Sequence, residues 1–262
     1  MLSLSLDLME NLWLLAGGGL FSGLLAGLFG IGGGTVLVPI IITVGYTPVQ
    51  AVATSSLAIV LTALSGSWQN YRMGYLDLKR VWSLGFSAII TAQFGAYIAS
   101  DLSDRILLFA FGILLLINIF LASWRKTLAK QDDQGQEKTQ YRTLGRVATG
   151  GLAGFLAGLF GIGGGVIMVP LQMVLLGESI KVAIQTSLGV IVITAISATV
   201  GHAWQGNVLF WQGLILGCGG LVGAQVSTRY LPKLRDRAIA FGFYALLVIL
   251  AIYTFWRASL LN

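Results

Sequence analysis

Apolar residues run along this chain in long blocks that charged residues rarely interrupt. Nearly charge-free stretches cover residues 11–71, 81–100, 106–124, 147–177, 182–228 and 238–256. One helix needs about 20 apolar residues to cross the hydrocarbon core of a bilayer. The longest stretches are therefore long enough to cross it more than once, and the ten-residue alternation of a membrane β-barrel is not visible. The pattern predicts an all-α fold, a polytopic α-helical membrane protein.

Short polar or glycine-rich interruptions divide each half of the chain into five apolar segments. In the first half these segments cover residues 12–29, 35–44, 52–70, 81–100 and 105–124. In the second half they cover residues 146–160, 166–176, 183–202, 209–228 and 236–256. The second segment of each half is too short for an ordinary crossing and contains Pro39 or Pro170, which removes a helical hydrogen bond. We expect this segment to be either a kinked, thin crossing or a broken half-helix.

The two halves are copies of each other. The decapeptide LAGLFGIGGG occurs at residues 25–34 and again, unchanged, at residues 156–165. TSSLAIVLTALS at residues 54–65 is echoed by TSLGVIVITAIS at residues 186–197. The sequence therefore predicts a first transmembrane repeat at residues 1–125, a polar cytoplasmic linker at 126–143 and a second transmembrane repeat at 144–262.

Positive charge indicates how the two repeats lie relative to each other. Residues 71–80 hold three Lys or Arg residues, while the matching loop at 202–208 holds none. The bias reverses in the next pair of loops, since residues 229–237 hold four and the matching residues 101–105 hold one. Lys and Arg concentrate in cytoplasmic loops, so the swap predicts two inverted homologous repeats.

The inverted arrangement places almost all basic residues on one side of the membrane. With the linker inside and an odd number of crossings in each repeat, only Arg105 and Arg257 of the 16 Lys and Arg residues remain outside. Four crossings per repeat, with the short segment re-entrant, would leave more of them outside. Each repeat has four to five membrane segments, and a total of eight or ten crossings stays open because the first two segments can form a hairpin.

Composition narrows the class of function. Of the 262 residues, 56% are hydrophobic and 10% are charged, against about 25% charged in a soluble domain. One Cys and one His supply neither a disulfide framework nor a multi-ligand metal site. The net charge of +6 fits cytoplasmic loops better than a nucleic-acid surface. We expect no enzyme, no catalytic residues, no metal, no cofactor and no nucleic-acid partner.

The many glycines fall into two groups. Six have the GxxxG spacing that lets helices pack closely in lipid: Gly19, Gly23, Gly27, Gly150, Gly154 and Gly158. Two triplets interrupt a helix instead of following one face of it: Gly32, Gly33 and Gly34, and then Gly163, Gly164 and Gly165. A phosphate loop is a poor alternative, because GIGGGT lacks the last glycine of a dinucleotide fingerprint and the Lys of a Walker loop.

Unwound backbone at membrane depth persists only where protein or a water-filled cavity covers it. In secondary transporters, paired broken segments of inverted repeats meet at the substrate site. Free N–H groups at the start of each short segment would carry partial positive charge and suit a small anion. We therefore predict that the two triplets form a substrate site, with a purely structural hinge as the alternative.

Polar side chains on the third segments are the other candidates for binding substrate. These are Ser55, Thr62, Asn70, Ser187, Thr194 and His202. Their hydroxyl groups either line a pathway or bond back to a carbonyl group of their own helix. Asn70 and His202 hold equivalent positions, and His202 is either an interfacial hydrogen-bonding residue or a proton-coupling group. Gln93 and Gln225 are expected to make helix-to-helix hydrogen bonds.

The chain resembles the sulfite exporter TauE/SafE family of membrane transporters. The resemblance rests on GLLAGLFGIGGGTVLVP and GFLAGLFGIGGGVIMVP, on ATSSL and QTSLG, and on HAWQGN and GAQVS, and it covers essentially the whole chain. It implies a multi-pass plasma-membrane protein, usually of eight helices, that moves small sulfur-containing anions such as sulfite or sulfonates. The first repeat has Asn70 where the second repeat has His202. The chain therefore lacks the second histidine that a paired-histidine role would need.

The combined prediction is a secondary membrane transporter of small anions, most simply sulfite or organosulfonates. It would work by alternating access between the two inverted repeats, and a passive anion channel is the alternative. The partners would be the small anionic substrate and the lipid bilayer. The sequence leaves a homo-oligomer open.

Overall fold

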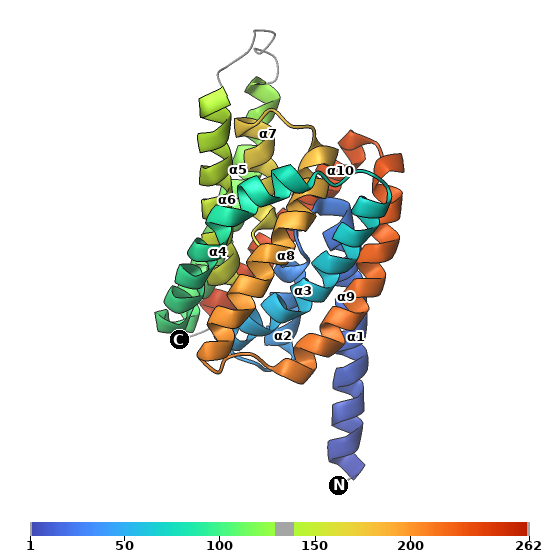
Figure 1. Cartoon of the computed structure of the whole chain (residues 1–262). Helices are drawn as coiled ribbons and strands as arrows, with labels where there is room; N and C mark the ends of the chain where they lie inside the picture. The colour runs from blue at the N-terminus through green and yellow to red at the C-terminus, as the bar shows by residue number, and fades with distance from the viewer. Residues whose placement is uncertain (1, 129–138, 261–262) are drawn as a thin grey trace.

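The computed structural model describes residues 2–128 and 139–260, with no strand within these ranges. The first half contains α1 (Leu2–Phe29), α2 (Gly34–Thr43), α3 (Pro48–Arg72), α4 (Leu78–Asp101) and α5 (Asp104–Leu128). The second half contains α6 (Thr139–Phe160), α7 (Gly165–Leu175), α8 (Ile180–Trp204), α9 (Phe210–Tyr230), the 3-10 turn η1 (Leu231–Lys233) and α10 (Asp236–Ser259). Each predicted apolar segment corresponds to one helix (Figure 1), so the all-α polytopic class is confirmed.

Within these described ranges, six helices are long and apolar enough to cross a membrane: α1, α3, α4, α5, α8 and α10. The short helices α2 and α7 begin at the last glycine of each triplet, so the second segment of each half is a broken half-helix. Of the predicted linker, residues 129–138 lie outside the described residues. The division into two repeats and a linker stays a prediction.

Local capping sets where the long helices begin. The Thr47 side chain accepts a hydrogen bond from the Gln50 N–H at the start of α3, in a capping box with Pro48 as the first helical residue. Ser179 accepts from the Val182 N–H at the start of α8. These caps satisfy backbone N–H groups in the first turn of each helix, which have no partner inside the helix. They also hold the loops that join each half-helix to the long helix that follows it.

The glycines with GxxxG spacing bring helix backbones into direct contact. α1 packs on α9, where a side chain at Gly19 or Gly23 would collide with a carbonyl oxygen of α9. In the same way, α6 packs on α4, where a side chain at Gly150 or Gly158 would collide with a carbonyl oxygen of α4. A side chain at Gly154 would likewise collide with the Ala88 carbonyl oxygen, so five of the six glycines predicted for packing meet backbone oxygen, and the sixth, Gly27, meets the Ser227 hydroxyl group. The packing prediction is confirmed.

The directions of the helices follow from these contacts. α3 and α9 run parallel to each other. Leu57 of α3 lies beside Gly213 of α9, and Ser65, further along α3, donates to the Leu221 carbonyl oxygen, further along α9. α3 and α8 run in opposite directions in Figure 1, and Gly66 in the second half of α3 lies beside Leu188 in the first half of α8. In Figure 1, α1, α3 and α9 therefore ascend while α4, α6 and α8 descend.

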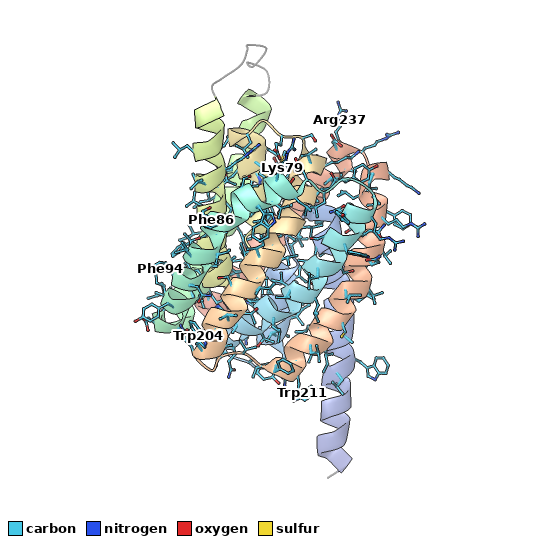
Figure 2. All side chains as sticks on the ribbon, viewed as in Figure 1. Lys79, Phe86, Phe94, Trp204, Trp211 and Arg237 are labelled. Atoms are coloured by element: carbon cyan, nitrogen blue, oxygen red, sulfur yellow. The ribbon has the colours of Figure 1, made fainter. Side chains whose placement is uncertain are left out.

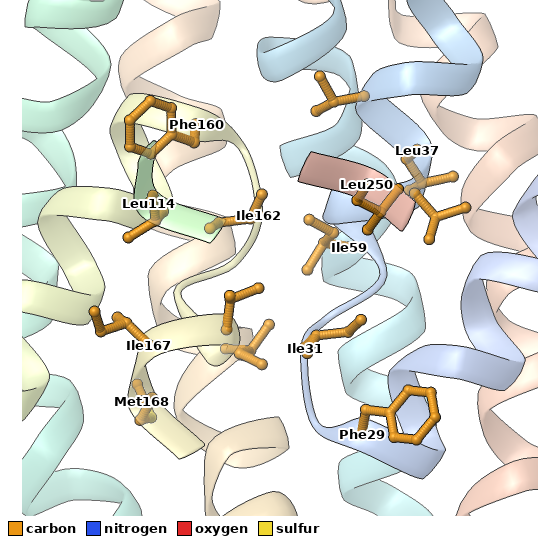
Figure 3. Close-up of a cluster of buried hydrophobic side chains, with 14 of the residues drawn as sticks. Phe29, Ile31, Leu37, Ile59, Leu114, Phe160, Ile162, Ile167, Met168 and Leu250 are labelled. Carbon is orange, nitrogen blue, oxygen red and sulfur yellow. The ribbon is translucent and has the colours of Figure 1, made fainter. Parts of the chain in front are cut away.

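Each broken segment doubles back on the helix before it. Gly33 lies against Ser22, and Gly18 lies beside the Ile40 side chain, so α2 returns antiparallel to α1. The α6–α7 pair repeats this, with Gly164 against Ala153. Figure 3 shows the two loops facing each other in opposite directions, with Phe160 at the upper end of one and Phe29 at the lower end of the other. Both half-helices start in the middle of the molecule.

The two ends of the molecule differ in charge. Lys79 and Arg237 lie near the upper end in Figure 2, where α3 and α9 finish, and we call this the basic end. Trp204 and Trp211 lie at the opposite end. Between the two ends, Phe86 and Phe94 point outward and are 71% and 61% exposed, as expected for side chains that face lipid.

Candidate functional site

The two glycine triplets meet at the centre of the molecule. A side chain at Gly34 would collide with the Gly161 carbonyl oxygen, and one at Gly165 would collide with the Gly30 carbonyl oxygen. All six triplet glycines are buried. The structure therefore brings together the two stretches that the sequence singled out (Figure 3).

Glycine is needed at the last turn of each loop for a steric reason. Gly33 and Gly164 precede the half-helices with φ of 85° and 77°, in the left-handed region that L side chains rarely adopt. Any side chain there would also collide with the preceding helix, at the Ser22 hydroxyl or the Ala153 carbonyl oxygen. These two positions are required by the hairpin itself, whatever the loops bind.

Backbone N–H groups are left without partners where the half-helices begin. In the described part of the chain, the N–H groups of Gly34, Thr35, Gly165 and Val166 make no hydrogen bond. The glycine N-caps supply no side chain to satisfy them. Buried backbone donors without a partner are rare in native proteins, and at a helix start they carry partial positive charge. The paired breaks are thus chemically suited to an anion.

Three hydroxyl groups hold the carbonyl oxygens of the two loops. Ser55 Oγ donates to the Gly161 carbonyl oxygen at 2.7 Å, which joins the first half of the chain to the second. Thr194 Oγ1 donates to the Gly163 carbonyl oxygen at 2.9 Å. Ser22 Oγ donates to the Gly33 carbonyl oxygen at 2.9 Å. Of the predicted side chains, Ser55 and Thr194 therefore lie directly at the loops.

Thr62 and Ser187 have more ordinary partners. Thr62 Oγ1 donates at 3.0 Å to the Ala58 carbonyl oxygen of its own helix, as expected for a hydroxyl group buried in a helix bundle. Ser187 Oγ accepts from Gln172 Nε2 of α7 at 2.9 Å. Neither hydroxyl group contacts a glycine triplet through these bonds, so their role in binding stays a prediction.

Asn70 and His202 lie at the far ends of α3 and α8 and not at the glycine loops. His202 is fully buried, and its Nε2 lies 2.8 Å from the Gly158 carbonyl oxygen of α6. A carbonyl oxygen only accepts, so Nε2 is the protonated nitrogen in this bond. Asn70 is also fully buried, and its amide has no hydrogen-bond partner among the described residues. In this conformation the equivalent pair occupies opposite ends of the molecule.

Two polar residues near the half-helices were not singled out from the sequence. Thr35 is the second residue of α2, is fully buried, and its hydroxyl group has no hydrogen-bond partner in the described part of the chain. Gln172 of α7 is fully buried and bonds to α8 through its Nε2. The available signal for Thr35 was a difference between the copies, because Val166 holds the same place after the second triplet.

The loops are closed in this conformation. Ile59, Ile162 and Ile191 pack within 3.3 Å of the place where a side chain at Gly32 would begin. Cavities of about 290 and 520 Å³ lie elsewhere, the first lined by Arg80 and Arg146 and the second by Gln93 and Trp204. A substrate at the triplets therefore requires the two halves to move apart.

The predicted glutamine contacts are confirmed. Gln93 Nε2 of α4 donates to the Ser197 carbonyl oxygen of α8 at 2.7 Å. Gln225 Nε2 of α9 donates to Gln69 Oε1 of α3 at 2.8 Å. Both residues connect neighbouring helices.

Sequence comparisons agree with this architecture. The family model of the sulfite exporter TauE/SafE matches residues 15–254. "Probable membrane transporter protein YunE" of Bacillus subtilis is 28% identical over 253 residues, covering 88% of this chain and 93% of that protein. "Probable membrane transporter protein YdhB" of the same organism is also 28% identical, covering 80% of this chain and 88% of that protein.

A relative from another organism is similar over a comparable share of the chain. "Probable membrane transporter protein MJ0441" of Methanocaldococcus jannaschii is 27% identical and covers 70% of this chain and 69% of that protein. The family and its relatives are membrane transporters and not enzymes. With ten α-helices in residues 2–128 and 139–260, paired broken segments and a family match over most of its length, the chain is a multi-pass membrane transporter that belongs to the sulfite exporter TauE/SafE family.

Proposed function

We propose that this protein is a secondary transporter of small anions, sulfite or organosulfonates, that works by alternating access. The observation that carries the proposal is the meeting of two half-helix starts whose backbone N–H groups have no partners in the described structure. Backbone N–H donors and two helix dipoles can bind an anion without an Arg side chain, whose charge would be costly to bury at the centre of a membrane. The family name supplies the sulfur anion as the substrate class.

We further propose that the halves are inverted repeats. The opposite directions of α3 and α8 at their crossing support this, as does the pairing of α1 with α9 and of α6 with α4. When the two halves are exchanged, the α1–α9 contact becomes the α6–α4 contact, and the α3–α8 contact becomes itself. A symmetric pair of halves around one central site is the usual basis for alternating access.

We propose that the protein lies in the plasma membrane. Its basic end would face the cytoplasm. Residues 71–80 and 229–237, where α3 meets α4 and α9 meets α10, carry seven of the described Lys and Arg residues at that end, while Arg105 and Arg257 lie at the opposite end. This distribution follows the positive-inside rule.

The closed loops suggest how the cycle proceeds. The Gly161 carbonyl oxygen covers the start of α2, and the Gly30 carbonyl oxygen covers the start of α7. Separation of the α1–α2 and α6–α7 hairpins would uncover both starts and admit the anion in place of these oxygens. The Ser55 bond to Gly161 crosses between the halves and would have to break or move during opening.

Flux measurements on purified protein in liposomes test the proposal. We expect external sulfite to drive exchange of trapped labelled sulfite, and an imposed gradient to accumulate it above its equilibrium level. Flux that only dissipates the sulfite gradient, with no exchange stimulated from the opposite side, would identify a passive anion channel. Absence of sulfite or sulfonate flux would refute the substrate assignment.

A pair of matched variants tests the central site. Thr35→Val keeps the shape of the side chain but removes the buried unpaired hydroxyl group, so we expect sulfite affinity to fall at least fivefold. Val166→Thr adds a hydroxyl group at the matching place and serves as the control. If Thr35 has no ligand, removing a buried, unsatisfied hydroxyl group should raise stability by about 1–3 kcal/mol and leave affinity unchanged.

A further inference from the structure

An ion pair fastens the basic end of the molecule. Arg80, near the start of α4, places its Nη1 3.3 Å from Oε1 of Glu178 in the loop between α7 and α8. Arg80 Nε also lies 3.2 Å from Asp77 Oδ2. The Glu178 side chain is 12% exposed and that of Arg80 is 38% exposed, so only the carboxylate side of the pair is shielded from water. The pair joins a long helix to the loop that follows a half-helix.

The opposite end has a neutral counterpart at the matching positions. Gln212, near the start of α9, donates from Nε2 to the Tyr46 hydroxyl group at 3.0 Å. In the duplication, Gln212 corresponds to Arg80, and Tyr46 corresponds to Glu178. The two ends are therefore fastened by the same contact, charged at the basic end and uncharged at the other.

A cavity of about 290 Å³ adjoins the charged pair. Arg80, Arg146 of α6, Glu178 and Ser179 line it. Among the described residues, Arg146 has no ion-pair partner, and its matching position in the first half is the apolar Leu15. A water molecule occupies about 30 Å³ of liquid, so the cavity has room for a small oxyanion and several waters.

We propose that this cavity is an entry site for an oxyanion at the basic end, held by Arg80 and Arg146. Guanidinium groups bind oxyanions through two parallel N–H bonds, which suits sulfite and sulfonate. The anion competes with Glu178 for Arg80, so its arrival loosens the contact between α4 and the α7–α8 loop. The inference rests on the proposed function for the identity of the anion.

The charged cavity makes the two faces of the transporter unequal. The basic end gathers the anion before the halves open, whereas the opposite end has Gln212, Tyr46 and Leu15 at the matching places. Local concentration of substrate by positive charge raises the rate of its capture. We therefore expect a lower half-saturating sulfite concentration at the basic end than at the other end.

Binding in detergent tests the site apart from transport. Calorimetric titration with sulfite uses a Thr35→Val background, in which the central site is weakened. Arg146→Gln should weaken the remaining binding at least tenfold, and Glu178→Gln should strengthen it severalfold. Arg237→Gln removes an exposed basic residue at the same end, outside the cavity, and should leave binding within twofold. Equal losses in Arg146→Gln and Arg237→Gln would refute the site.

A lipid headgroup is the other source of the same chemistry. Short-chain phosphatidylglycerol and inorganic phosphate are therefore titrated against sulfite. Sulfite that displaces bound phosphatidylglycerol, with the displacement lost in Arg146→Gln, supports the proposal. Phosphatidylglycerol binding that sulfite does not displace would assign the cavity to lipid and overturn it.

Sidedness of transport provides the second test. In right-side-out and inside-out vesicles, Arg146→Gln should raise the half-saturating sulfite concentration only at the basic end. The triple variant Arg80→Gln, Arg146→Leu and Glu178→Tyr copies the opposite end and should make the two faces alike. Equal changes on both faces would overturn the entry site. Loss of all sulfite flux in the unmodified protein would instead refute the proposed function, while the binding titration still decides on the cavity.

Discussion

Hydroxyl side chains in the interior are used mainly to hold backbone carbonyl groups. Both Ser55 and its neighbour Ser56 lie within hydrogen-bond distance of the Val52 carbonyl oxygen of their own helix, at 2.9 and 3.0 Å, but only Ser55 also donates across the halves to Gly161, at 2.7 Å. Both are buried serines with adjacent positions on α3. They therefore form a matched pair for measuring what the cross-half bond contributes.

Ser55→Ala should destabilise the protein, because it leaves the buried Gly161 carbonyl oxygen without this donor. We expect a loss of about 1–3 kcal/mol, and little change for Ser56→Ala, whose partner carbonyl also belongs to a helical hydrogen bond. Chemical unfolding of the purified protein in detergent measures both. Equal stability of the two variants would show that the Ser55 bond adds nothing beyond an ordinary helix contact.

The role of His202 as a hydrogen-bond donor can be tested with two amide side chains of different length. Gln places a donor near the position of Nε2 and can keep the bond to the Gly158 carbonyl oxygen, while Asn is too short to reach it. We expect His202→Gln to retain stability and the pH dependence of transport, and His202→Asn to lose about 1–3 kcal/mol. A transport rate that becomes independent of pH in His202→Gln would restore the proton-coupling alternative.

At the scale of helices, packing in this fold depends on contact between backbones. Gly17 and Gly19 lie two residues apart on α1, yet only Gly19 faces α9, where a side chain would collide with the Leu216 carbonyl oxygen. Nothing lies within 4 Å of a side-chain carbon placed at Gly17. We expect Gly19→Ala to lower the unfolding temperature and Gly17→Ala to leave it unchanged or raise it slightly, because Ala favours the helix. The opposite order would mean that α1 and α9 do not pack in this way.

The sequence predicted each helix because apolar blocks, glycine triplets and prolines mark the boundaries directly. α2 was expected at residues 35–44 and lies at Gly34–Thr43. The return of α2 along α1 was left open, since a glycine triplet permits a reversal of the chain without specifying its direction. That direction depends on tertiary contacts, such as the one between Gly33 and Ser22.

The site was predicted less completely than the helices. The duplication correctly brought the triplets together, because equivalent breaks in two packed copies meet near their shared axis. Asn70 and His202 are equivalent too, but they lie at opposite ends of the molecule, and their role in binding stays a prediction. Thr35 escaped notice because it departs from the repeat, and only the structure shows that its hydroxyl group is buried without a partner in the described part of the chain.

At the scale of the whole molecule, the proposed orientation can be tested with single cysteines. Cys218 is the one natural cysteine, so Cys218→Ser provides a cysteine-free background. Ala203→Cys lies beside Trp204 at the end of α8, and Ala238→Cys lies in the first turn of α10 at the basic end. Both positions are exposed, and neither change alters the charge of a loop that determines orientation.

In intact cells, a membrane-impermeant thiol reagent should label Ala203→Cys and leave Ala238→Cys unlabelled until the membrane is opened. The two positions lie at opposite ends of the helices, so inverted repeats with a cytoplasmic basic end require opposite results. Labelling of both from outside would show that the chain does not hold one orientation. Labelling of Ala238→Cys alone would place the basic end outside, against the distribution of Lys and Arg, and the charged cavity would then receive anions from the surroundings instead of the cytoplasm.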